Sequence, residues 1–154
     1  MLTILFYVLL FAIVSTIVTI VTERQKINGW KASGNPANFF KVAQHYDKKG
    51  SYKDAMLWYE KAAEGGIVEA LYELSLCYDL PKGCEKDSEK AFRLCLGAAK
   101  QGLEKAQYRV ACGYENGLGT DKDLDQAIYW FEQASNNGNK IAANKLERLR
   151  AQRS

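Results

Sequence analysis

Few residues in this sequence are of types that carry out catalysis. The single histidine, His45, precedes a tyrosine in a stretch predicted to be helical, where we expect it at the surface or partly packed. The carboxylates Glu60, Glu64, Asp87 and Asp123 fall at predicted caps or exposed positions, and no spacing pairs them as acid and base. The sequence also lacks phosphate-loop, HExxH, GxSxG and dinucleotide motifs. We expect no catalytic residue, no metal site and no cofactor, so an enzyme, such as a cell-wall hydrolase, is the least favoured function.

Cysteines are the other chemically versatile residues, and there are four of them. None forms a CxxC pair, which argues against zinc and thioredoxin chemistry. Cys95 is expected in the core, and Cys112 falls on a predicted helix. Cys77 and Cys84 flank the end of a helix and its loop and could come close enough to bridge. A reducing compartment such as the cytoplasm would disfavour that disulfide.

The N-terminal segment has the composition of a membrane span. Residues 1–22 carry no charge, and residues 2–21 read LTILFYVLLFAIVSTIVTIV. As a helix, such a stretch rises about 30 Å, the thickness of the hydrocarbon core of a bilayer. The run is long for a signal peptide and has no basic start, which favours an uncleaved anchor. We expect residues 1–24 to be a transmembrane helix that includes Leu2, Phe6, Phe11 and Val21.

The charges beside this span predict its orientation. No Lys or Arg precedes it, whereas Arg24, Lys26 and Lys31 follow it, so the positive-inside rule favours a cytoplasmic C-terminal domain. Residues 25–35, QKINGWKASGN, contain two glycines and no periodicity, and are predicted to be a linker. Trp30 either lies at the membrane interface or packs on the first helix of the domain. Asn35 and Pro36 predict a helix start.

The rest of the sequence repeats itself every 36 residues, which indicates a solenoid or array. Each unit has the pattern of two helices, with Asp87 and Asp123 predicted as N-caps and Gly102 and Gly138 at helix ends. Alanines seven residues apart give each second helix a small face for close packing. The matched positions are Ala70 and Ala106, Tyr72 and Tyr108, Tyr78 and Tyr114, Gly83 and Gly119; the paired alanines are Ala55 and Ala62, Ala91 and Ala98, Ala127 and Ala134.

These units resemble known repeats. The first resembles a tetratricopeptide repeat, and the next two, with a longer GLGT-type loop, resemble SEL-1-like repeats. The middle unit departs from the pattern, with Leu94 and Cys95 in place of Trp-Tyr, and is expected to pack or turn differently. The positions that carry the tetratricopeptide resemblance are Ala43, Tyr46, Gly50, Tyr52, Ala55, Tyr59 and Ala62.

The resemblance implies an all-α fold: a short α-solenoid of antiparallel helix pairs behind the N-terminal transmembrane helix. We expect a tetratricopeptide-like repeat at 36–69, SEL-1-like repeats at 70–105 and 106–141, and a capping helix and tail at 142–154. In the families it resembles, first helices line the concave, partner-binding face. The positions carried over are Phe40, Gln44, Tyr72, Leu76, Asp79, Tyr108, Cys112, Glu115 and Asn144. The aromatic row in this set either grips a peptide or fills the core between units.

The resemblance implies a non-catalytic protein–protein interaction module. A short array beside a membrane span predicts an adaptor or accessory subunit of a membrane protein complex. Its expected partners are other proteins, chiefly membrane proteins of one complex, and membrane lipid through residues 1–22. The basic C-terminal residues are expected to form a solvated helix face, and no nucleic acid partner is predicted. The alternative is an envelope-side (periplasmic) assembly or signalling factor, which an oxidised Cys77–Cys84 pair would favour.

Overall fold

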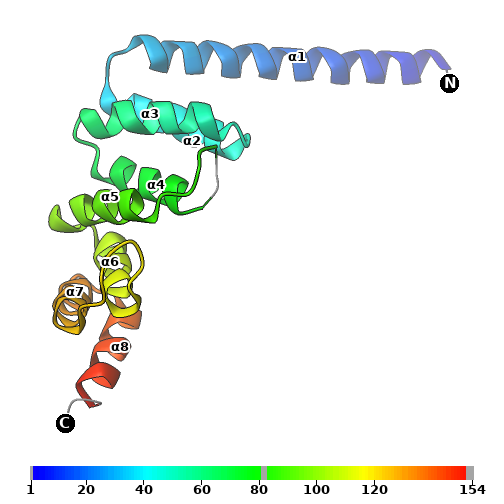
Figure 1. Cartoon of the computed structure of the whole chain (residues 1–154). Helices are drawn as coiled ribbons and strands as arrows, with labels where there is room; N and C mark the ends of the chain where they lie inside the picture. The colour runs from blue at the N-terminus through cyan, green and yellow to red at the C-terminus, as the bar shows by residue number, and fades with distance from the viewer. Residues whose placement is uncertain (1, 81–82, 152–154) are drawn as a thin grey trace.

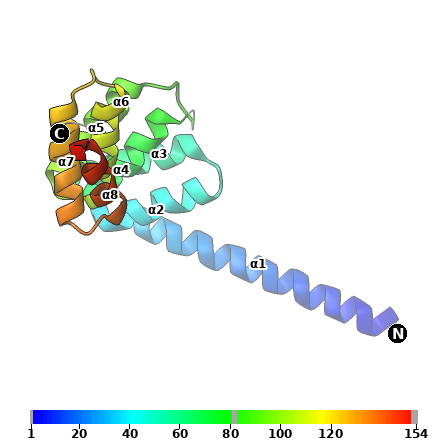
Figure 2. The same cartoon turned by 90° about the horizontal axis from the view of Figure 1, so that it is seen from below.

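The computed structural model describes residues 2–80 and 83–151, with the side chains of residues 2–6 excepted. All regular structure in these residues is helical. The helices stack as successive antiparallel pairs, and α1 projects from the end of the stack formed by α2 and α3 (Figures 1 and 2). Their bounds are α1 Leu2–Ala32, α2 Pro36–Lys48, α3 Tyr52–Glu64, α4 Val68–Asp79, α5 Ser88–Lys100, α6 Glu104–Asn116, α7 Leu124–Asn136 and α8 Lys140–Ala151. The predicted all-α solenoid with a terminal capping helix is confirmed.

Helix α1 is long and apolar enough to cross a membrane, although a signal sequence has the same features. The side chains of Phe11 and Val21 are 78% and 47% exposed, while those of Leu2 and Phe6 lie outside the described part. The hydroxyl groups of three threonines donate to carbonyl oxygens of the preceding turn at 2.7 to 2.9 Å. The polar side chains at these positions are therefore satisfied within the helix, as a hydrocarbon environment requires.

The prediction of a linker over residues 25–35 is wrong for most of its length. Helix α1 continues to Ala32, and only residues 33–35 connect it to α2. Ile27 is buried, and Trp30 is half-buried between lysines of α1 and α2. These tertiary contacts outweigh the low helix propensity of Gly29. The predicted start of α2 is confirmed, because the Asn35 side chain accepts a hydrogen bond from a backbone amide of its first turn at 2.9 Å.

Alanine lines the contacts between neighbouring helices. The six paired alanines of the second helices are all 5% exposed or less, which confirms the predicted small face. Two clusters of buried residues follow from this packing: one joins α2–α5, and the other runs from α4 to α8. Cys95 is buried, and Leu94 packs against the first cluster, so each fills core space in the middle unit as an aromatic pair does elsewhere.

The loops of the middle and third units begin differently, in agreement with the expectation that the middle unit differs. The C-cap residue of α4, Leu80, has an extended conformation, whereas that of α6, Gly117, has the left-handed conformation, with φ at +74°. The side chains of Asp87 and Asp123 each accept from the backbone amide three residues later, at 2.8 and 3.0 Å, which confirms both N-caps. The backbone amides of the same two residues donate to the carbonyl oxygens of Tyr78 and Tyr114, at 2.9 and 3.0 Å. The two loops are therefore equivalent where they enter the next helix, at Asp87 and Asp123.

The repeated glycine of these loops lets each loop backbone pack closely against the preceding repeat. A Cβ atom at Gly119, where φ is +71°, would lie 2.0 Å from the carbonyl oxygen of Ser88 at the start of α5. A Cβ atom at Gly83 would lie 2.9 Å from the backbone nitrogen of Lys53 near the start of α3. The two glycines are 36 residues apart and contact equivalent helix starts. Close backbone approach explains why this position repeats.

We expect Gly119→Ala to destabilise the solenoid far more than Gly50→Ala. Both glycines have a positive φ, +71° and +74°, so both variants bear the left-handed strain of about 1–2 kcal/mol. Only Gly119→Ala adds the clash with Ser88, which we expect to bring its total loss to about 3–5 kcal/mol. Urea unfolding of the full chain in detergent, followed by circular dichroism, measures both. Equal losses would show that the loop does not depend on close contact.

Candidate partner-binding face

Ion pairs connect the first helices of successive units. Asp79 of α4 pairs with Arg109 of α6, and Glu115 of α6 pairs with Lys145 of α8. The second pair is the first shifted by 36 residues at both partners. We use the name first-helix ridge for the four side chains of these ion pairs together with three predicted partner-binding residues of α4 and α6. Its members are Tyr72, Leu76, Asp79, Tyr108, Arg109, Glu115 and Lys145.

The energy of these ion pairs is limited by water. The side chains of Arg109 and Asp79 are 36% and 31% exposed, and such pairs contribute roughly 1 kcal/mol or less each. Burial alone lowers the pKa of Lys145, but its hydrogen bond to Glu115 and the surrounding charges outweigh burial and raise the pKa. The ridge therefore presents fixed charges of alternating sign rather than a strong stabilising network.

The aromatic row is half-buried in the core clusters. The ring of Phe40 lies 5.7 Å from that of Tyr59, and the ring of Tyr108 lies 5.8 Å from that of Phe131. Burial raises the pKa of Tyr72, whose ring also lies 5.0 Å below the ammonium of a lysine on α6. Each ring thus stabilises contacts between helices and leaves only part of its surface for a partner.

The other predicted positions are less closely grouped. Leu76 is half-buried on α4, and Asn144 is exposed on α8. Gln44 is exposed and lines a cavity between α1 and α2, away from the ion pairs. The prediction that these residues together form one binding face stays a prediction.

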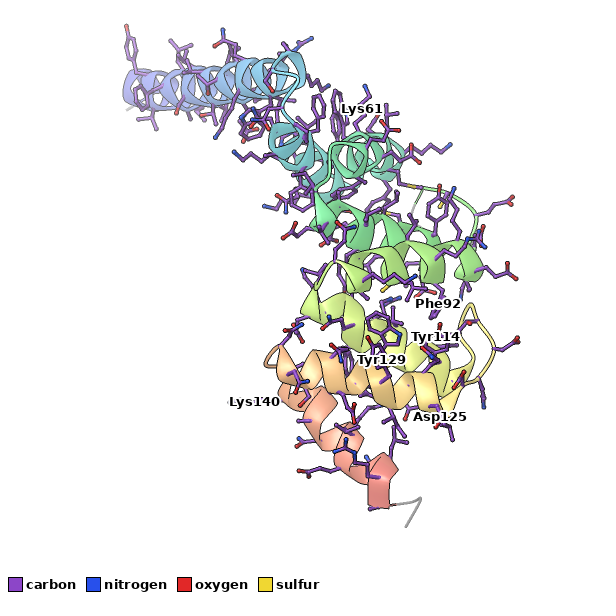
Figure 3. The ribbon with its side chains drawn as sticks, turned by 90° about the vertical axis from the view of Figure 1, so that its left-hand side faces the viewer. Lys61, Phe92, Tyr114, Asp125, Tyr129 and Lys140 are labelled. Atoms are coloured by element: carbon purple, nitrogen blue, oxygen red, sulfur yellow. The ribbon has the colours of Figure 1, made fainter. Side chains whose placement is uncertain are left out.

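A cavity of about 240 Å³ opens beside the ridge, where α4, α5 and α6 meet. Asp79 and Arg109 flank it, Phe92 and Cys112 contribute to its wall, and Leu118 lies at its edge with 62% of its side chain exposed. The centroids of the Phe92 and Tyr114 rings lie 5.0 Å apart, and the rings meet edge to face. Figure 3 labels the two residues, which lie close together. An apolar floor flanked by a charged pair is suited to an apolar side chain presented by another protein.

Sequence reasoning missed three residues of this region: Arg109, Phe92 and Leu118. The 36-residue repeat contained a signal for Arg109. An acidic residue is followed 30 residues later by a basic residue in two consecutive units. Leu118 also stood out as an apolar residue within a polar loop. Phe92 gave no signal, since an apolar residue on a second helix is expected in the core.

The cysteines are thiols in the structure, and no disulfide joins Cys77 to Cys84. The Cys84 Sγ instead donates to the Cys77 carbonyl oxygen at 3.4 Å. Burial raises the pKa of Cys95 to about 11. Burial, followed by nearby lysines, lowers the pKa of His45. Within residues 2–80 and 83–151, no three residues of the types His, Cys, Asp and Glu gather where they could hold a metal ion.

The repeats match a known family. Residues 43–67, 68–103 and 104–139 each match the Sel1 repeat. The chain belongs to the Sel1 repeat family. Sel1 repeats form a protein-interaction scaffold, so protein partners are implied.

Relatives and solved structures agree with this family. The chain is 40% identical over 91 residues to the chitin synthase regulator SKT5 of Saccharomyces cerevisiae, covering 58% of this chain but 13% of that protein. A Sel1 repeat protein from Oxalobacter formigenes is 30% identical with a TM-score of 0.71, over 75% of this chain and 49% of that one. A protective antigen of uropathogenic Escherichia coli with an SLR fold is 28% identical with a TM-score of 0.74, over 82% and 28%. The chain therefore spans only a small part of the yeast relative.

We expect iodoacetamide at pH 8 to modify Cys84 in the folded full chain and to leave Cys95 unmodified. The raised pKa of Cys95 reduces its thiolate at this pH by about a hundredfold, and burial blocks access to it. Peptide mapping by mass spectrometry, with the same protein in urea as a control in which all four thiols react, makes the comparison. Equal rates at the two sites in the folded protein would contradict the buried position of Cys95.

Proposed function

We propose that this chain is a non-catalytic adaptor: α1 anchors it in a membrane, and the solenoid binds a partner protein as an accessory subunit of a membrane protein complex. The cavity beside the first-helix ridge carries this proposal, because it combines an accessible apolar wall with a charged pair at its rim. The partner presents an apolar side chain to Phe92 and Leu118 and polar groups to Asp79 and Arg109.

The comparisons support a regulatory rather than a catalytic role. The relative in Saccharomyces cerevisiae is named as a regulator of another protein, chitin synthase, and one in Schizosaccharomyces pombe as a chitin synthase regulatory factor. A mouse relative is named as a binder of DAP3. Binding to other proteins is what these names share. The absence of a nucleophile–base pair in the sequence agrees with this role.

A variant at the cavity edge tests the proposal. Leu118 and Leu124 are both exposed leucines beside the same loop, with 62% and 49% of their side chains exposed, but only Leu118 lines the cavity. We expect tagged full-length protein, solubilised in mild detergent, to recover one membrane protein at near-equal stoichiometry. Leu118→Asp reduces that recovery roughly tenfold or more, since burial of one leucine contributes about 1.5–3 kcal/mol.

Leu124→Asp is the matched control and keeps the partner, because its added charge lies outside the cavity. Quantitative mass spectrometry of the recovered proteins gives the ratio, and circular dichroism checks that both variants are folded. If both variants lost the partner equally, or neither did, the cavity would not be the binding site.

The charges after the span also predict the side on which the solenoid lies. We expect the reporter variant Gln101→Cys, at an exposed position, to resist a membrane-impermeant maleimide in intact cells and to react after lysis. The unmodified chain, treated identically, corrects for its own thiols. Labelling in intact cells would place the solenoid outside the cytoplasm and favour an envelope-side factor.

A further inference from the structure

A basic cavity of about 270 Å³ lies where α1 meets α2. It is enclosed by the last turns of α1 on one side and by the outer face of α2 on the other. Three of its side chains are lysines, and one is a carboxylate. The lining residues are Glu23, Lys26, Ile27, Trp30, Lys41, Gln44, His45 and Lys48.

Two of these lysines converge on one indole ring. The Lys26 Nζ lies 5.0 Å from the centre of the Trp30 ring, and the Lys41 Nζ lies 5.8 Å from it. Lys26 belongs to α1 and Lys41 to α2, so the fold brings like charges together. Among the described residues, none of the ion pairs involves a lysine of this cavity. Three lysines against one carboxylate, Glu23, leave the cavity with a net positive charge, which favours the binding of an anion.

The cavity lies at the depth of lipid headgroups if α1 spans the membrane. The uncharged stretch ends at Thr22, and Lys26 and Trp30 follow four and eight residues later. A rise of 1.5 Å per residue places them about 6 and 12 Å beyond the hydrocarbon core. The headgroup layer is about 5–8 Å thick on each side. Lys26 is therefore within this layer, and Trp30 lies just outside it on the aqueous side.

We propose that this cavity binds the phosphate group of an anionic phospholipid from the leaflet on the side of the solenoid. The inference rests on the membrane anchoring in the proposed function. Lys26 and Lys41 contact the phosphate oxygens, Lys48 adds a third positive charge, and the Trp30 ring holds the Lys26 and Lys41 ammonium groups close together. The lowered pKa of His45, caused by burial and then by Lys49, keeps that ring neutral at physiological pH and so places the positive charge on the lysines.

A lipid bound here would also set the orientation of the solenoid. The cavity takes side chains from both α1 and α2, so one headgroup contacts the span and the first repeat together. An anionic headgroup thereby stabilises one angle between them. A neutral headgroup such as phosphatidylcholine carries its own cation and satisfies the lysines less well.

The test uses the full chain in detergent, titrated with phosphatidylglycerol or phosphatidylcholine and examined by native mass spectrometry. We expect the chain to bind phosphatidylglycerol about tenfold more tightly, and Lys41→Gln with Lys48→Gln to remove that preference. A tenfold preference corresponds to about 1.4 kcal/mol. Two lysines beside an anionic headgroup account for this factor. The matched control, Lys86→Gln with Lys100→Gln, removes the same charge from exposed sites and keeps the preference.

Three results would overturn the inference. Equal binding of the two lipids would show that the cavity does not select anionic headgroups, and a preference that survives Lys41→Gln with Lys48→Gln would place the lipid elsewhere. Displacement of phosphatidylglycerol by millimolar inorganic phosphate would assign the cavity to a free anion. Extraction of the chain from membranes by alkaline carbonate separates the two proposals. Full extraction would remove the anchor and this site together, whereas an anchored chain without lipid preference would remove only the site.

Discussion

The close approach of neighbouring helices is the constraint on which the structure depends. Two helices can pack at short distance only where the side chains between them are small, and the buried alanines of the second helices meet that condition in every unit. The loop glycines Gly119 and Gly83 also lack a side chain where they contact the start of a helix in the preceding repeat. The solenoid therefore gains its stability from repeated local contacts, each between adjacent elements.

Small residues form the closest helix contacts, and larger side chains such as Tyr59, Trp130 and Phe131 fill the wider spaces of the core. Tyr72 and Tyr108 fill space between units while keeping part of each ring at the surface. The ion pairs lie beside them, outside the core, where water weakens them. Alanine and glycine specify how repeats stack, and charged and aromatic residues specify what the stack presents.

Most of the fold was predictable from sequence, since its signals are local. Asp87 and Asp123 could be recognised as caps because a cap needs only the residue and the helix that follows it. The extent of α1 could not, because the burial of Ile27 depends on α2 folding back against it. Gly119 was recognised as a repeated position, yet its reason, contact with Ser88, required the preceding repeat in place.

The candidate site was less predictable. Asp79 and Glu115 were inferred from the resemblance, but their partners Arg109 and Lys145 lie 30 residues away, and only the rise of the stack brings each pair together. The cavity edge at Leu118 depends on how one loop folds over another helix. The helix on which a residue lies can be predicted from sequence more readily than the residue that it contacts in the next repeat.

The continuity of α1 has a mechanical consequence. A helix of 31 residues is about 46 Å long, and three residues join it to α2. A flexible linker after an anchor would let a domain adopt many positions. The short junction between α1 and α2 instead restricts the position of the solenoid relative to α1. If α1 spans a membrane as proposed, a small tilt of its apolar part would swing the far end of the stack, where α8 lies, through a larger arc. Bilayer thickness, which is one of the influences on helix tilt, would then affect the height of the solenoid above the membrane.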